Sequence, residues 1–159
     1  MSAVVIITRD KRLETRLRRS LELAGLNPVV TGSVFMAAHI ISNTPVEAIL
    51  VDREATPERG VAICTKLRGR FGLNTPPMIL VDNDDTPASK LVARAAGAEC
   101  ILKRTASNNR MVSVTEMVAR RKQSDKRCRF QETAWKWDRF SAVSGAFAPL
   151  TNRPTLFAG

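Results

Sequence analysis

Polar and charged residues stand directly after several short apolar runs of this 159-residue sequence. They are Thr8, Arg9 and Asp10 after the first run, and Asp52, Asp82 and Lys103 after three later runs. Short apolar runs of this kind are typical of strands buried on both faces of a parallel sheet. The carboxyl ends of such strands meet at the crevice where open α/β sheets place their chemistry. We therefore expect a site of mixed charge at that edge, with Asp52 as its principal residue.

The elements that position these residues alternate regularly along the chain. Apolar runs predict five strands, at residues 3–7, 28–31, 48–52, 77–81 and 100–102. Helical spacing of apolar residues predicts five helices, at residues 12–24, 34–41, 60–71, 87–96 and 108–122. The apolar faces of the first and last helices are expected to consist of Leu13, Leu17, Leu21, Ala24, Met111, Val114, Met117 and Val118. This alternation predicts an α/β fold with a doubly wound, flavodoxin-like sheet of five parallel strands in the order 2-1-3-4-5.

The pattern resembles the CheY-like receiver domains of bacterial response regulators. The resemblance covers residues 3–122 and depends on Asp52 ending the third strand, Gly60 opening the next helix, Gly97-Ala98 before the fifth strand, and Lys103 ending it. In that family the matching aspartate accepts a phosphoryl group from a histidine kinase, an acidic pair after the first strand binds magnesium, and the lysine contacts the phosphoryl oxygens. The cation and the ammonium would relieve the repulsion between a carboxylate and a dianionic phosphoryl group.

The magnesium-binding part of that switch is altered in this sequence. Thr8 and Arg9 stand where the acidic pair belongs, and Asp10, one residue later, replaces it only if the loop shifts. Asp82 stands where a hydroxyl is expected, so its negative charge would oppose a phosphoryl group beside Asp52. We therefore predict a degenerate receiver, or pseudo-receiver, without magnesium-dependent phosphorylation.

The fifth strand departs from the family as well. The chain has no tyrosine, and Cys100 is assigned to the position of the family's switching aromatic residue. The link from Gly97 to Lys103 is one residue short, and Arg104 stands where a proline usually follows the lysine. These changes also argue against a working switch.

Two interpretations of the charged edge are open. In the first, Asp52 and Asp82 are neutralised by Arg9 and Lys103 in a fixed ion-pair network, since an unpaired buried charge is costly. In the second, Asp52 is the phosphoacceptor of a two-component phosphorelay. We favour the first because Arg9 offers a ready partner.

A change in composition near residue 122 predicts a receiver-like domain at residues 1–122 and a C-terminal extension at residues 123–159. The net charge of +10 is concentrated in the last 40 residues, which carry 9 basic and 3 acidic side chains against 16 and 12 in the first 119. Six of the eight aromatic residues also lie in the last 40. We expect this basic, aromatic extension to be partly disordered without a ligand or partner.

Cations and aromatic residues alternate in the extension. Guanidinium planes and indoles stack on nucleobases, arginine donates two hydrogen bonds to guanine, and clustered positive charge attracts phosphates. A subgroup of CheY-like proteins has a similar plan, in which an arginine-rich extension binds cyclic di-GMP and the protein docks on flagellar-motor or other targets. By this resemblance we expect cyclic di-GMP to be held by Arg127, Arg129, Trp135, Trp137, Asp138 and Arg139.

Three alternatives to this ligand are open. In the first, the aromatic residues of the extension cover an apolar face of the domain. In the second, the cations of the extension bind nucleic acid. In the third, the chain is an adaptor that binds a partner through its last two helices and fifth strand. The extension is too short for the DNA-binding output domain that many response regulators carry, which disfavours a sequence-specific DNA binder. The favoured function is a non-enzymatic signalling protein with a protein target.

Motifs of other functional classes are missing from the sequence. It has no phosphate-cradling glycine loop, nucleophile elbow or metalloprotease motif, so we predict no enzyme activity, resident cofactor or metal site. His39, the only histidine, is expected to be partly buried without a catalytic role. The three cysteines show no metal-ligand or redox spacing. The sequence has no run long enough for a membrane span and no signal peptide, so we expect a cytoplasmic protein.

Overall fold

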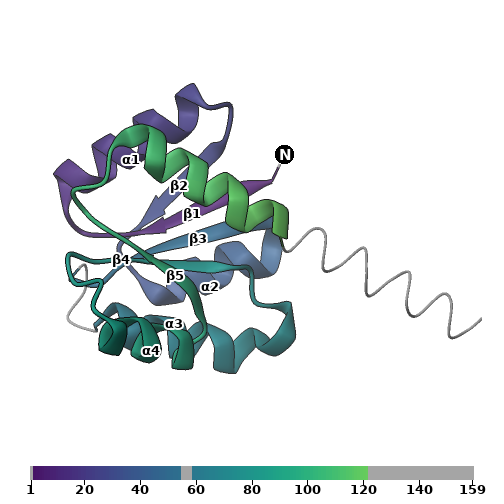
Figure 1. Cartoon of the computed structure of the whole chain (residues 1–159). Helices are drawn as coiled ribbons and strands as arrows, with labels where there is room; N and C mark the ends of the chain where they lie inside the picture. The colour runs from purple at the N-terminus through teal and green to yellow at the C-terminus, as the bar shows by residue number, and fades with distance from the viewer. Residues whose placement is uncertain (1, 55–58, 122–159) are drawn as a thin grey trace, which may run out of the picture. The chain divides into compact units, whose positions relative to one another are not determined.

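A computed structural model describes residues 2–54 and 59–121 of the chain. They contain one five-stranded parallel sheet with the strand order β2-β1-β3-β4-β5 (Figure 1). The strands are β1 (Ala3–Ile7), β2 (Asn27–Thr31), β3 (Val46–Asp52), β4 (Met78–Val81) and β5 (Ala98–Leu102). The predicted flavodoxin-like α/β fold and its strand order are confirmed. The predicted C-terminal extension lies outside the described residues.

Helices connect the strands in the predicted alternation. They are α1 (Lys11–Leu23), α2 (Val34–Asn43), α3 (Gly60–Phe71), the short 3-10 helix η1 (Gly72–Asn74) and α4 (Pro87–Ala95). A last helix, called here the C-terminal helix, begins at residue 108 and is described to residue 121. Within the described residues, no helix has the length and apolar character needed to cross a bilayer.

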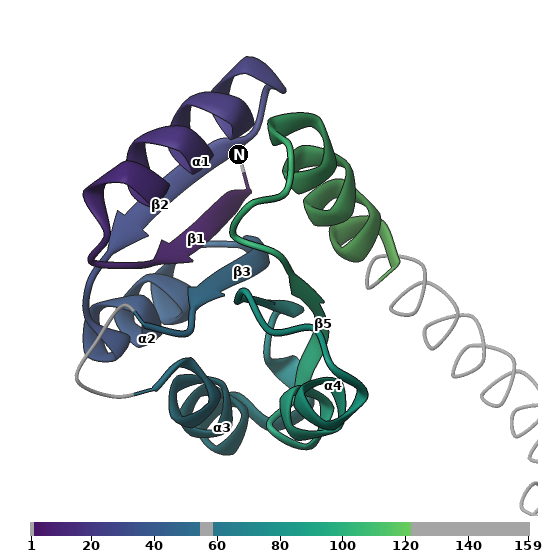
Figure 2. The ribbon, with the colours of Figure 1, turned by 60° about the vertical axis from the view of Figure 1, so that its left-hand side comes forward.

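These helices cover both faces of the sheet (Figure 2). One face packs against α1 and the C-terminal helix through Leu13, Leu17, Leu21, Met111 and Val118. The other face packs against α2, α3 and α4 through Ala37, Ala38, Ile63, Leu67 and Ala93. Because both faces are covered, the middle strands are almost entirely apolar and buried. Polar side chains of these strands are therefore confined to the strand ends.

The apolar faces of two helices differ from the prediction at single positions. Ala24 and Met117 were expected to face the core, but both are exposed, Ala24 because α1 has already ended at that residue. Ser20 and Thr115 are buried in their helices instead. Each hydroxyl donates a hydrogen bond to a backbone carbonyl four residues earlier, at 2.7 Å in both cases, so burial leaves neither hydroxyl unpaired.

Candidate functional site

The polar residues singled out in the sequence lie at the carboxyl ends of the strands, on one edge of the sheet. Thr8 follows β1, Asp52 ends β3, Asp82 follows β4 and Lys103 follows β5. The parallel register of these strands brings the four positions to the same edge. Only some of the side chains that were predicted to contact Asp52 and Asp82 do so.

Asp52 is buried at the end of β3, with 2% of its surface exposed. Both of its carboxylate oxygens accept hydrogen bonds. Oδ2 accepts one from Thr8 Oγ1 at 2.9 Å. Oδ1 accepts one from the backbone N–H of Glu54 at 3.2 Å and one from Arg104 Nη1 at 2.7 Å. These contacts supply the partners that a buried carboxylate needs to offset its lost hydration.

Arg104 bridges two carboxylates at this edge. Its Nη1 lies 2.7 Å from Asp52 Oδ1, and its Nη2 lies 2.6 Å from Asp10 Oδ2. Nη1 also lies 3.5 Å from Oε2 of the largely exposed Glu54. The side chains of Arg104 and Asp52 are 16% and 1% exposed, so solvent screens the attraction between them only weakly. The pair is a fixed structural feature of the site.

Asp10 connects this pair to the start of α1. Its side chain caps the helix by accepting a hydrogen bond from the backbone N–H of Arg12 at 2.9 Å. This hydrogen bond, together with the contacts of Arg104, lowers the pKa of Asp10 below its ordinary value. A carboxylate at a helix N-terminus is also favoured by the helix dipole. Both carboxylate oxygens of Asp10 are therefore occupied, Oδ1 by the start of α1 and Oδ2 by Arg104.

The prediction that Arg9 neutralises Asp52 was wrong. Arg9 Nε donates a hydrogen bond to the backbone carbonyl of Gly32 at 3.4 Å, in the link that follows β2. Its side chain lies against that glycine, where an added Cβ would come within 3.2 Å of Arg9 Cγ. Successive side chains of an extended segment point in opposite directions. Because Thr8 points toward Asp52, Arg9 points away from it.

The prediction that Lys103 belongs to the same network was also wrong. Lys103 Nζ lies 3.2 Å from Asp85 Oδ2, in a pair whose side chains are 51% and 47% exposed. Arg53 takes the predicted place of Lys103 by donating from Nη1 to Asp82 Oδ2. The hydrogen bond with Asp82 raises the pKa of Arg53. The charge of Asp82 is therefore already neutralised within the domain.

No protein-family model matches the sequence. No curated protein matches it either. The structure is similar to that of the Francisella response regulator 1452 receiver domain, at 19% identity and a TM-score of 0.68, over 77% of this chain and 99% of that one. The fold is that of a receiver domain.

Two further receiver-fold structures show the same extent of similarity. The Vibrio cholerae chemotaxis protein CheY4 has 15% identity and a TM-score of 0.68, over 74% of this chain and 98% of that one. The BeF3-activated N-terminal receiver domain of Klebsiella pneumoniae RstA has 18% identity and a TM-score of 0.66, over 75% and 99%. The similarity therefore spans the whole of each of these domains.

The residues at the edge of this receiver fold do not fit the magnesium ion that the family resemblance implies. A hard divalent cation needs several oxygen ligands that are free to coordinate it. Here one guanidinium already binds the two candidate carboxylates, Asp10 and Asp52. The described part of the chain holds no group of three or more acidic, histidine or cysteine side chains placed to bind a metal.

Sequence reasoning missed Arg104, although a signal for it was present. The link from Gly97 to Lys103 is one residue short, so the residue at the expected distance along the receiver fold is Arg104. Cys100, assigned from the sequence to the position of the switching aromatic residue, is partly buried in β5. Ile101 packs with the core against α2, α3 and α4, whereas Cys100 packs on the other face.

The remaining candidate residues lie away from this site. His39 was predicted to be partly buried, but it is exposed, because α2 buries the neighbouring Ala37 and Ala38 instead. Asn43 Nδ2 donates to the backbone carbonyl of His39 at 2.8 Å. The six residues predicted to bind cyclic di-GMP all lie outside the described residues.

Proposed function

We propose that this chain is a signalling protein whose receiver-fold domain works without phosphorylation and docks on a protein target. The observation that carries this proposal is the Arg104 guanidinium, which bridges Asp52 and Asp10. A bridge between two carboxylates holds the site in one arrangement, independent of a bound metal ion. Such a pseudo-receiver transmits a signal through its surfaces.

The chemistry of phosphoryl transfer supports the proposal. An attacking carboxylate must present a free oxygen to the phosphorus atom, with cations placed on the phosphoryl oxygens. Both oxygens of Asp52 are occupied, by Thr8 on one side and by Arg104 on the other. Phosphorylation would therefore require the breaking of a buried, charge-assisted hydrogen bond before any new one forms.

The last two helices carry exposed apolar side chains. Leu91 and Val92 on α4 are 69% and 53% exposed, and Met117 on the C-terminal helix is 45% exposed. By the resemblance to receiver domains, we propose the last two helices and the fifth strand as the docking surface.

Intact-mass spectrometry of the full chain tests the proposal. The protein is incubated with acetyl phosphate at millimolar magnesium, and no covalent phosphate at Asp52 is expected. Fluorine NMR with beryllofluoride should likewise show no signal of a bound adduct. A variant with Thr8→Asp, Arg9→Asp and Arg104→Lys restores the family's pattern and should bind magnesium more tightly than the wild type. A phosphorylated wild-type chain whose modification disappears in Asp52→Asn would instead establish the alternative, a phosphoacceptor of a two-component phosphorelay.

We further propose cyclic di-GMP as a ligand of the C-terminal extension. The supporting observation is compositional, since the last 40 residues combine a net charge of +6 with six of the chain's eight aromatic residues. Two guanine bases offer faces for the tryptophans and edges for the arginines, and two phosphates need positive charge. Arg127, Arg129, Trp135, Trp137, Asp138 and Arg139 remain the proposed contacts.

Calorimetry with the full chain tests this ligand. Replacement of Trp135 or Trp137 by alanine should weaken binding by roughly one to two orders of magnitude if that indole stacks on a base, because stacking contributes about 1–3 kcal/mol. Cyclic di-AMP and single-stranded nucleic acid serve as competitors. Equal affinity for all three would establish a general nucleic-acid or polyanion binder in place of a cyclic di-GMP receptor.

A further inference from the structure

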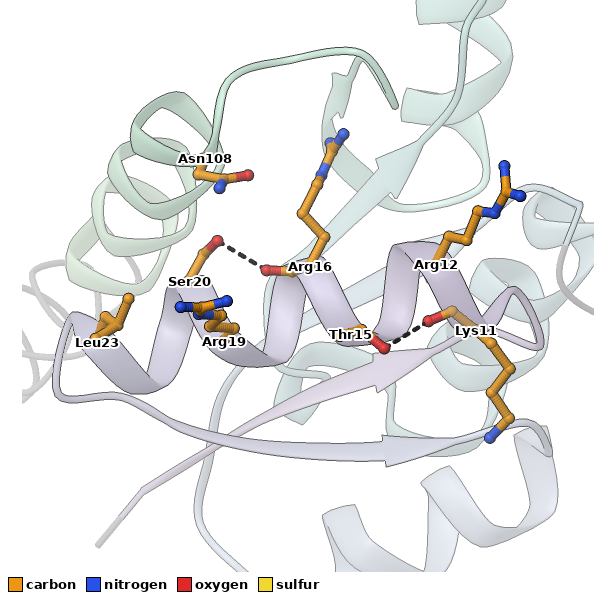
Figure 3. A pocket seen from close by; sticks show the side chains of 8 residues that line it. All are labelled: Lys11, Arg12, Thr15, Arg16, Arg19, Ser20, Leu23 and Asn108. Carbon is orange, nitrogen blue, oxygen red and sulfur yellow. Dashed lines mark hydrogen bonds between the residues drawn. The ribbon is translucent and has the colours of Figure 1, made fainter.

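A groove of about 640 Å³ runs along α1, apart from the Asp52 site (Figure 3). Seven of its eight lining residues belong to α1, and the eighth, Asn108, is the first residue of the C-terminal helix. Four of the eight are cations, namely Lys11, Arg12, Arg16 and Arg19, and none is acidic. Its volume lies within the range of roughly 300–1,000 Å³ that is typical of small-molecule sites.

The charge of this groove is largely uncompensated. Arg12 and Arg19 are exposed and form no ion pair with any described residue. Glu14, the acidic residue in the first turn of α1, contacts Lys11 at 3.0 Å and Arg18 at 3.1 Å and does not line the groove. A concave surface with charge of one sign concentrates counter-ions.

Arg16 provides an independent observation at the same place. Its Nε is the one buried side-chain nitrogen or oxygen atom in the described residues that has no hydrogen-bond partner. Its Nη2 is occupied, since it donates to the backbone carbonyls of Arg104 and Ala106. Arg16 therefore has one guanidinium donor for which no described residue supplies an acceptor.

We infer that this groove binds the phosphate group of a small organic ligand. Guanidinium groups match phosphate in charge and in the geometry of their donors. The start of the C-terminal helix, at Asn108, adds the positive end of a helix dipole. Leu23, which is 81% exposed at the far end of the groove lining, offers apolar contact for the rest of the ligand. A site made of one helix face and one helix end suits a small ligand better than a polynucleotide.

This inference does not depend on the proposed function of Asp52 or on the extension, because all lining residues precede residue 122. The contacts of each arginine decide which one can be replaced to test the groove. Arg16 also holds the segment that carries Arg104, so its replacement would disturb both sites. Arg19 is exposed, lines the groove and forms no ion pair within the described residues. Its neighbour Arg18 pairs with Glu14 outside the groove and is the matched control.

The experiment is a titration of the full-length protein with pyrophosphate and with GMP at constant ionic strength, followed by NMR of the arginine Nε–H groups and backbone amides. We expect saturable shifts of the Arg16 Nε–H and Asn108 amide resonances. Arg19→Gln should raise the dissociation constant about three- to tenfold, as loss of one charge-assisted contact at an exposed site would. Arg18→Gln, which removes the same charge from the same helix, should change it less than twofold.

Two results would overturn the inference. One is that Arg19→Gln and Arg18→Gln weaken ligand binding equally, which would mean that the ligand responds only to the overall charge of the protein. The other is a titration in which Arg16 and Asn108 do not shift up to millimolar ligand, whether or not resonances of residues 123–159 do. Neither result bears on phosphorylation of Asp52, which mass spectrometry measures separately.

Discussion

Arg104 Nη2 lies 2.6 Å from Asp10 Oδ2, although the two residues are separated by 94 positions in the chain. The contact joins the loop after β5 to the N-terminal cap of α1. Since Nη1 of the same guanidinium lies on Asp52, one side chain connects the ends of β1, β3 and β5.

Replacement of Arg104 by alanine should destabilise the domain by about 3 kcal/mol, because it leaves the buried carboxylate of Asp52 without its cation. Lys103→Ala is the control one residue away, and it should cost less than about 1 kcal/mol because its pair with Asp85 is half exposed. Urea unfolding followed by circular dichroism measures both. Equal destabilisation by the two variants would contradict the assignment of Arg104 as the partner of Asp52.

Gly60→Ala should destabilise the domain by about 1–3 kcal/mol through overpacking. A Cβ at this position would lie 2.8 Å from Arg53 Cα, 2.9 Å from Leu80 Cδ1 and 3.0 Å from the Asp52 carbonyl oxygen. Gly69 in the same helix has nothing within 4 Å of an added Cβ, so Gly69→Ala should instead stabilise by up to about 1 kcal/mol. Thermal and urea unfolding would contradict this account if both variants shifted stability in the same direction.

The contribution of Asp10 to stability should depend on pH. Its pKa in the folded protein lies below the value of about 3.9 for an unfolded aspartate, so its charge stabilises the fold above about pH 4. That contribution is lost as the pH falls through the folded pKa. Asp10→Asn keeps an acceptor for the helix cap but lacks the charge. The difference in unfolding free energy between wild type and Asp10→Asn should therefore be largest near pH 6 and shrink toward pH 3, and a difference independent of pH would contradict the prediction.

The thiol of Cys64 should be unreactive in the folded protein. Burial raises its pKa to about 12, so the thiolate that alkylating reagents attack is scarce at pH 8. Iodoacetamide labelling with peptide mass spectrometry should show Cys64 modified only in urea. Burial also raises the pKa of Cys100, but this thiol is only partly buried and is more accessible to the reagent, so it should react first. Faster modification of Cys64 than of Cys100 in the absence of urea would contradict the packing described for α3.

The fold was predictable because its signals are local. Five apolar runs and the helical spacing between them were enough for a doubly wound parallel sheet, since short right-handed connections leave few topologies for such an alternation. Individual helix positions were less predictable. Ser20 and Thr115 can be buried because each hydroxyl donates a hydrogen bond to a backbone carbonyl of its own helix. A search for apolar residues at helical spacing does not detect such buried polar residues.

Thr8, Asp52 and Asp82 could be placed at one edge of the sheet from the sequence alone, because strand ends and chain order put them there. Their partners could not be read in the same way. Arg104 lies 52 positions from Asp52, and whether it or Lys103 reaches the carboxylate depends on how the end of β5 meets the loops beside it. An ion pair is set by the direction and reach of two long side chains, a property of packed loops that no local pattern of residue types contains.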